Sequence, residues 1–327
     1  MKIIAYDLPT TTRISSEDFS LTIRPFAPAA RAHWDELDPD DADYIMVPFT
    51  FLAQVPALDA WPQRIGGDIM LPFVFRSAVS GAHDVREELR NSIVRAFLRA
   101  FPLYERYPAK HVFIDNGDMD VPCVVLRNSV LFKTNATYRD PDARPVPYPV
   151  PDPGPPGLIR EAEVDLSFQG HVQQHPIRQR LSHWSLHQKE LAVEFRSTAK
   201  SFHVESPDKR AQMARESFEL MLRSKYVLSP RGRGPTSRRF FEILAHGRIP
   251  VLISDAARLP LESVLDYDRF VVRVPEGFIS LIPDYIRRFE FEHDLSEASG
   301  LARRAYLDYF APGSFRRYVE TVFATEL

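Results

Sequence analysis

The sequence predicts an α/β protein with two domains, each built on a parallel β-sheet. Short apolar runs that stop at a polar residue or a proline alternate with amphipathic helical stretches, as in layered α/β folds. A proline-rich segment separates the 327 residues into two such halves. Because single hydrophobic cores rarely grow beyond about 250 residues, the length also favours two cores.

In the first half, residues 2–6, 44–48 and 111–115 are the expected strands. Each is a short apolar run that ends at a proline or an aspartate, and proline cannot donate to a strand ladder. Residues 85–101 carry apolar side chains at helical spacing, with arginine and glutamate on the other face. The half therefore reads as strands alternating with helices.

The connector between the halves is predicted at residues 139–157, which hold eight of the chain's 28 prolines. This density excludes a helix or a central strand. We expect domains at residues 1–150 and 151–327. A proline-rich recognition motif is the alternative, but the position between two α/β halves favours a linker.

In the second half, a turn is expected at Gly170, directly after a strand. Strands and helices then alternate as in the first half. The expected strands are residues 164–168, 226–229, 249–254 and 269–274, and the expected helices are 207–223, 236–246 and a stretch from 295.

The composition excludes several classes of protein. With 41 basic and 44 acidic residues, the formal net charge of −3 provides no broad field for nucleic acid. The single cysteine, Cys123, excludes an intrachain disulfide and a zinc cluster of thiolates. We read no export signal and no apolar run near the ~20 residues that span a bilayer, so we expect a cytoplasmic protein, free or peripheral to a membrane. The sequence carries no signal for an oligomeric state.

Residues 229–242 are the most informative segment, with a strand end, a basic glycine loop and a helix start in order. Gly232 and Gly234 let the backbone approach a ligand closely. Thr236 and Ser237 lie where a helix N-cap belongs, so free N–H groups and the positive helix end would face the loop. This arrangement predicts a phosphate site.

Charged side chains surround that loop. Four arginines, Arg231, Arg233, Arg238 and Arg239, add fixed positive charge with forked donors suited to phosphoryl oxygens. A surface i,i+4 ion pair with Glu242 is the alternative for Arg238. Glu242 itself could accept from two ribose hydroxyls. The loop is neither a Walker loop nor a dinucleotide fingerprint, because it lacks the lysine of the first and the third glycine of the second.

The segment resembles the C-terminal motif of the exostosin-like glycosyltransferases, glycosyltransferase family 47. The resemblance covers nearly the whole chain. It rests on Pro230-Arg231-Gly232, Ser237-Arg238-Arg239, Glu242 and residues 247–251, and more weakly on residues 6–9, 42–49, 168–170 and Arg178.

The resemblance implies two facing Rossmann-like domains of the GT-B type, with acceptor bound by the first and donor by the second. It implies an inverting transfer from a nucleotide sugar, usually UDP-linked, to a glycan or lipid-linked glycan in polysaccharide biosynthesis. The diphosphate would be held by Arg231, Ser237 and Arg238, the ribose by Glu242, and a further phosphate oxygen by Arg178. Around these residues, the expected donor site also includes Gly170, His171, Gly232, Arg233 and Thr236, and a structural role is the alternative for His171.

Sugar transfer needs a base for the acceptor hydroxyl, and carboxylates after strands of the first half are the candidates. Asp118 is the first choice, followed by Asp115 and Asp7. Asp118 and Asp120 also form an acidic pattern that could hold a divalent metal, but the arginines already suit the phosphates, so we expect no metal. The rival functions are a non-catalytic nucleotide-sugar or glycan-binding module and a sugar-nucleotide-modifying enzyme.

Overall fold

A computed structural model of the chain divides it into two units, Met1–Val146 and Pro147–Leu327. The division falls inside the proline-rich segment, slightly before the predicted boundary at residue 150. The structure describes residues 1–8, 12–15, 20–54, 92, 95–116, 128–138, 141–198 and 206–327.

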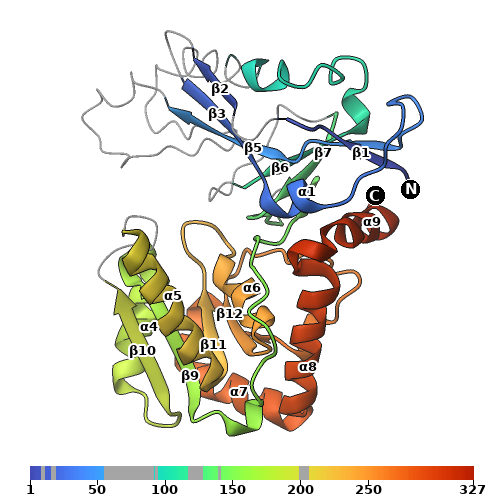
Figure 1. The fold of residues 1–327 in the computed structure, drawn as a ribbon. Coiled ribbons are helices and arrows are strands. Elements are labelled where there is room, and N and C mark those ends of the chain that lie inside the picture. Colours follow the sequence, from blue (N-terminus) through green and yellow to red (C-terminus); the bar gives the residue numbers. More distant parts are fainter. Residues whose placement is uncertain are drawn as a thin grey trace. The chain divides into compact units, whose positions relative to one another are not determined.

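The first unit contains a five-stranded parallel sheet (Figure 1). The β6 strand is buried along its whole length, as expected where both faces of a parallel sheet are covered. The parallel strands predicted from the apolar runs are confirmed. In spatial order the strands are β1 (Ile3–Ala5), β4 (Tyr44–Met46), β6 (His111–Asp115), β7 (Val130–Lys133) and β8 (Ala143–Pro145).

A three-stranded antiparallel sheet, which we did not predict, adds to the core of this unit. Its Leu21 and Ile23 are buried together with Phe101 and Phe113. The helix predicted over residues 85–101 lies largely outside the described residues, although 95–98 are helical. The antiparallel strands are β2 (Thr12–Ser15), β3 (Ser20–Pro25) and β5 (Phe49–Gln54), and the short helices are α1 (Ala27–Arg31) and η1 (Pro108–Lys110).

The second unit is built on a second five-stranded parallel sheet. Gly170, predicted as a turn, lies inside a strand instead, because the unpredicted β10 pairs with β9 as far as His171. In spatial order the strands are β10 (Val193–Thr198), β9 (Val164–His171), β11 (Ser224–Pro230), β12 (Ile249–Ile253) and β13 (Val272–Arg273).

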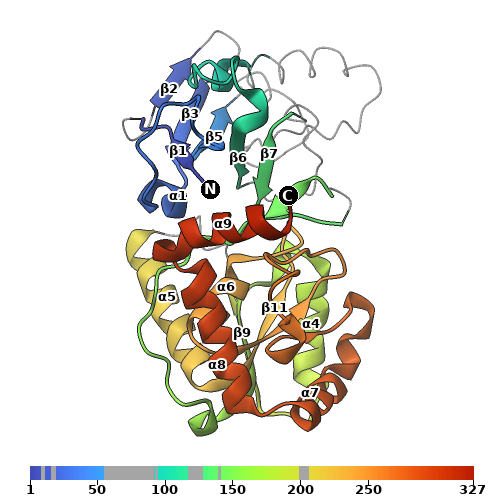
Figure 2. The same ribbon diagram turned by 90° about the vertical axis from the view of Figure 1, so that its right-hand side faces the viewer.

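Helices cover both faces of this sheet (Figure 2). On one face, Val227 packs with Met221 of α5 and Ile243 of α6, and on the other Tyr226 contacts Phe289 of α7. Strand β13 is shorter than predicted because a 3-10 turn, η6 (Tyr267–Arg269), precedes it. The helices are α4 (Pro176–His187), α5 (Pro207–Leu222), α6 (Arg238–Ala245), α7 (Ile282–Glu292), α8 (Leu295–Ala305) and α9 (Phe315–Thr325).

Arg248 fixes the far end of α6, where Gly247 adopts a φ of +58° that favours glycine. The Arg248 side chain is fully buried and donates to the carbonyls of Met221, Leu222 and Gly157. It therefore ties α5 and the proline-rich connector to the start of β12. Gly247 and Arg248, which belong to the segment that resembles family 47, thus hold these elements together.

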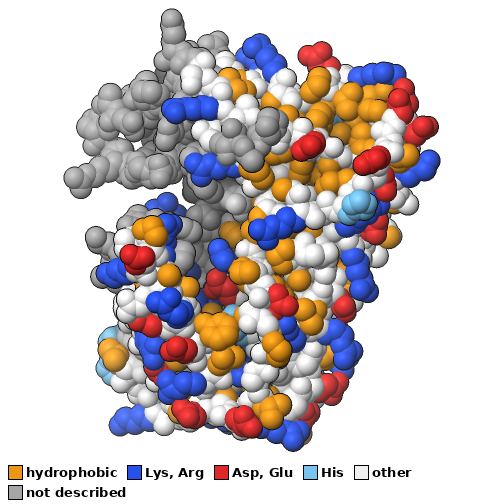
Figure 3. Space-filling model, viewed as in Figure 1, with side chains coloured by type: hydrophobic (Ala, Val, Ile, Leu, Met, Phe, Trp, Pro, Cys, Tyr) orange, Lys and Arg blue, Asp and Glu red, His pale blue; other side chains and the backbone are white. Residues whose placement is uncertain are grey.

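Basic and acidic side chains are intermixed on the visible face of the second unit (Figure 3), which agrees with the near-neutral net charge. Within the part of the chain that the structure describes, no helix combines the length and apolarity needed to cross a membrane.

Candidate donor site

The strand order of the second sheet creates a topological switch point between β9 and β11. The chain passes from β9 to β10 on one side and then to β11 on the other. Ligands of open α/β sheets bind outside the carboxyl ends of the strands at such a point. Here these ends are Gly170 with His171 on β9, and Ser229 with Pro230 on β11. The predicted donor residues lie at the end of β9, in the loop after β11, in the first turn of α4 and at or within α6.

Arg178, in the first turn of α4, ties the two strand ends together. Its Nε donates to the Arg231 carbonyl at 3.0 Å, and its other nitrogens donate to the carbonyls of Pro230 and His171 and to the side chain of Gln174. Burial, and secondarily the charge of Arg239, lower the pKa of Arg178 to about 10. Most of its five N–H donors thus hold protein oxygens. The structure gives this side chain a positioning role at the switch point.

Two glycines make room for that guanidinium. A Cβ at Gly232 would lie 3.3 Å from the Arg178 Nη2, and a Cβ at Gly170 would lie 2.9 Å from the Phe168 ring. The Phe168 ring in turn lies under the guanidinium, 5.8 Å from its carbon. A larger residue at either glycine position would displace the Phe168 ring or the Arg178 guanidinium. The absence of a side chain at Gly170 and Gly232 therefore leaves room for the Phe168 ring and the Arg178 guanidinium.

Arg231 lies in the loop directly after β11, and Glu276 approaches it. Its Nη1 is 3.6 Å from the Glu276 carboxylate, too long for a hydrogen bond. Its Nε is buried and makes no hydrogen bond. Glu276 is anchored through Asp255, whose backbone N–H donates to it at 3.3 Å. The Arg231 guanidinium is thus held near the switch point with donor capacity remaining.

Glu242, expected to hold a ribose, is engaged by two arginines of its own helix. Its oxygens lie 3.1 Å from the Arg238 Nε and 3.5 Å from the Arg239 Nε. The i,i+4 ion pair that was the alternative for Arg238 therefore forms, and the Arg238 side chain in it is about half exposed. Arg239 also donates to the Gln169 carbonyl at 3.0 Å and to the Ser217 hydroxyl. A ribose at Glu242 would have to share the carboxylate with these arginines.

The remaining predicted donor residues lie around the start of α6 and the end of β9. Ser237 is the N-cap residue, and its hydroxyl makes no capping bond. Thr236 is buried and Arg233 is exposed. The His171 Nδ1 lies 3.1 Å from the Thr198 carbonyl, which supports the structural alternative for that histidine. Positive charge exceeds negative charge here, with Arg178, Arg231, Arg233, Arg238 and Arg239 against Glu242 and Glu276.

Three residues of this edge escaped the sequence reasoning. Glu276 lies three residues beyond the end of β13, after Val274 and Pro275, so its place after a strand is a signal that the sequence reasoning did not use. Ser229 and Ser254 follow from no motif, because only the strand order brings the ends of β11 and β12 to one edge of the sheet. The sequence indicated Arg239 as one of the arginines suited to phosphoryl oxygens, whereas in the structure it also links α6 to β9.

The candidate bases belong to the first unit. Asp118 lies outside the described residues, as does Asp120. Asp115 ends β6, is 6% exposed and pairs in register with the buried Lys133. Asp7 is exposed, just beyond β1. Among the described residues, no three histidine, cysteine or acidic side chains are grouped as metal ligands.

Residue Tyr6, beside Asp7, is held in a buried network. Its hydroxyl lies 2.9 Å from the His111 Nε2 and accepts from the Leu103 N–H. The His111 Nδ1 is 2.7 Å from the Tyr107 carbonyl, so Nδ1 carries the proton and Nε2 accepts from the tyrosine. Burial raises the pKa of Tyr6 to about 12. The segment that carries Asp7 is thereby anchored.

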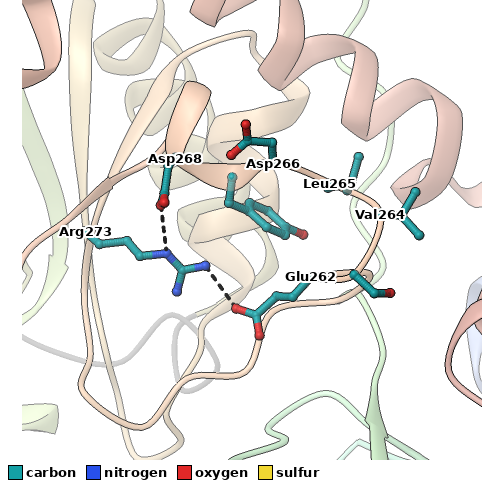
Figure 4. Close-up of a pocket in the computed structure, with 8 residues that line it drawn as sticks. Glu262, Val264, Leu265, Asp266, Asp268 and Arg273 are labelled. Carbon is teal, nitrogen blue, oxygen red and sulfur yellow. Dashed lines mark hydrogen bonds and ion pairs between the residues drawn. The ribbon is translucent and has the colours of Figure 1, made fainter. Parts of the chain in front are cut away.

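A separate pocket in the second unit contains none of the predicted site residues (Figure 4). It has a volume of about 390 Å3, and Arg273 lies in it 3.0 Å from Glu262 and 3.7 Å from Asp268. Asp266 adds a third carboxylate. Since carboxylates outnumber the single arginine, this pocket does not suit a diphosphate.

Comparisons with known proteins agree with the resemblance. The exostosin GT47 domain family matches residues 104–288. Exostosin-1 of Drosophila melanogaster is 39% identical over 79 residues, which are 24% of this chain and 10% of that protein. A probable glucuronoxylan glucuronosyltransferase of Arabidopsis thaliana is 21% identical over 314 residues, or 84% of this chain and 61% of the plant protein. The chain thus spans less than two thirds of either relative. The solved structure of TarM aligns with a TM-score of 0.37 at 11% identity, covering 66% of this chain and 54% of TarM.

Proposed function

Because this chain belongs to the exostosin GT47 family, matched over residues 104–288, we propose that it transfers a sugar from a nucleotide-sugar donor to a hydroxyl of a glycan acceptor. The donor is UDP-linked, the reaction inverts the anomeric centre, and no metal is required. The second unit binds the donor and the first unit binds the acceptor. A probable glucuronosyltransferase and a probable arabinosyltransferase among the similar proteins support a uronic acid or pentose as the sugar.

The observation that carries this proposal is the convergence of the donor residues at one switch point. Arg178 joins the loops after β9 and β11, Arg231 retains an unbonded Nε there, and α6 begins beside them at Ser237. Helix starts and arginine forks both favour phosphate oxygens. A diphosphate fits this edge better than an uncharged ligand does.

The chemistry follows from this charge. As the acceptor oxygen bonds to the anomeric carbon, the bond from that carbon to the diphosphate breaks, and its electron pair leaves with UDP. Fixed guanidinium groups and helix-end N–H groups stabilise that charge without reorganising. The acceptor proton passes to a carboxylate, with Asp118 first and Asp115 and Asp7 behind it.

The test is a thermal-shift screen across UDP-, GDP-, TDP- and CMP-sugars, followed by a turnover assay. A donor that binds the native state raises the unfolding midpoint. We expect a UDP-sugar to raise it most, slow release of UDP by hydrolysis, and faster release with a true acceptor. Binding of UDP without cleavage of any donor would instead support the non-catalytic binding module.

A further inference from the structure

Three serine hydroxyls at the carboxyl edge of the second sheet are buried without a hydrogen bond. They belong to Ser229, Ser237 and Ser254, and the Arg231 Nε shares this condition. Ser229 is 1% exposed. A buried polar group without a partner is costly and uncommon, so each calls for a physical reason.

Strand register places the Ser229 hydroxyl on the face of the sheet that α5 and α6 cover. Val227 pairs with Pro250 and Ser229 with Leu252, and paired residues of neighbouring strands share a face. Val227 packs against α5 and α6, so Ser229 also faces that side. Ser254 directly follows Ile253, the last residue of β12, at the same carboxyl edge. Ser237 begins α6 on this face.

The four unbonded groups share one chemical property, which is that each can donate a hydrogen bond. The Arg231 Nε can only donate, and a serine hydroxyl can turn to donate. A ligand that offers several acceptor oxygens can therefore satisfy all four at once. An oxyanion has this character, and the start of α6 and the surrounding arginines favour its charge.

We propose that Ser229 and Ser254, together with Ser237, donate hydrogen bonds to the diphosphate of the donor. The inference rests on the proposed function and adds two binding residues that neither the motif nor the family match assigns. Ser229 lies two residues before Arg231. Rotation about the Cα–Cβ bonds as the ligand enters would turn the hydroxyls toward its oxygens. They would then stabilise the charge that develops as the leaving group departs.

The test compares Ser229→Ala and Ser254→Ala with Ser167→Ala. Ser167 is an equally buried, unbonded serine whose register partner is Val227, so it lies on the same face but two residues back from the edge. Binding of UDP and of inorganic pyrophosphate is measured by calorimetry, and stability without ligand by urea unfolding. Each substitution removes an unsatisfied polar group, so unliganded stability should stay the same or rise.

We expect Ser229→Ala and Ser254→Ala each to weaken the binding of UDP and of pyrophosphate roughly tenfold. Ser167→Ala should bind both ligands as the wild type does. Wild-type affinity in both edge variants would overturn the inference and leave the proposed function standing. A loss with UDP but not with pyrophosphate would also overturn it, because the hydroxyls would then contact the nucleoside. Failure of the wild-type protein to bind either ligand would contradict the proposed function itself.

Discussion

The Nε of Arg178 donates a hydrogen bond to the backbone carbonyl of Arg231, 3.0 Å away and 53 residues further along the chain. This bond crosses from the start of α4 to the loop after β11. The same guanidinium reaches the carbonyls of His171 and Pro230. One buried side chain therefore sets the shape of the loop that is proposed to receive the diphosphate.

Replacement of Arg178 by alanine should destabilise the protein and weaken the binding of UDP. The change leaves three backbone carbonyl oxygens without their hydrogen-bond donor. We therefore expect the free energy of unfolding to fall by about 3 kcal/mol or more. Urea denaturation measures this. Arg180→Ala is the control, since this exposed arginine of the same helix makes a single bond to the Glu276 carbonyl, and we expect a loss below about 1 kcal/mol. Equal stability of the two variants would contradict the positioning role.

Arg238 and Arg239 should separate into a ligand residue and a structural one. Arg238→Ala loses only an exposed i,i+4 pair, about 0.2–0.5 kcal/mol, but should weaken UDP roughly tenfold. Arg239→Ala breaks links to β9 and α5 and should cost about 1.5–3 kcal/mol. Urea unfolding and UDP titration of both variants test this. An unchanged Kd for UDP in Arg238→Ala would leave that arginine as a surface ion pair only.

Gly170→Ala should cost about 1–3 kcal/mol of stability, because the new methyl group would lie 2.9 Å from the Phe168 ring. Gly300→Ala is the opposite control. Gly300 lies within α8 with open space around it, and alanine there should stabilise by about 0.5–1 kcal/mol. Thermal or urea unfolding distinguishes the two, and the expectation fails if both substitutions shift stability in the same direction.

Acidification should destabilise the fold through its buried histidines. Burial lowers the pKa of His111 and of His246 below the ordinary 6.5. The native state then binds fewer protons than the unfolded state, so stability present above pH 6.5 is lost as the pH falls through 6.5 toward the lower folded pKa. Each histidine contributes a slope of up to about 1.4 kcal/mol per pH unit. In urea unfolding from pH 7.5 to 5, His246→Asn should show a shallower slope than wild type, and identical slopes would refute this.

The strands predicted closest to their observed bounds are buried on both faces. The centre of β6, residues 112–114, and the whole of β12 read as apolar runs because these strands are buried along their length. α5 was predicted almost to the residue, since Ser206 and Pro207 form an ordinary helix start. β10 was missed because its VEFRST sequence forms a partly exposed edge strand whose apolar signal is weak.

The segments of the site could be predicted, but their contacts could not. Glycines, arginines and a helix cap in residues 229–242 indicate an anion site from composition alone. The partners of Arg178 are backbone carbonyls, which leave no trace in residue identity. Helix phase offered the pair of Arg238 with Glu242 as an alternative, but not the second contact of that carboxylate, with Arg239. Which donors remain unbonded, as at Ser229, depends on packing that only the fold determines.

Calorimetric titration of UDP into the wild-type protein and into Arg231→Ala tests the central claim most directly. Removal of a charged donor at the switch point should weaken UDP by about 1.5–3 kcal/mol, or roughly tenfold or more in Kd. Arg287→Ala, which removes an exposed arginine of α7 paired with Glu190 and Asp284, should bind UDP as wild type does. Wild-type affinity for UDP in Arg231→Ala would contradict the assignment of this edge as the diphosphate site.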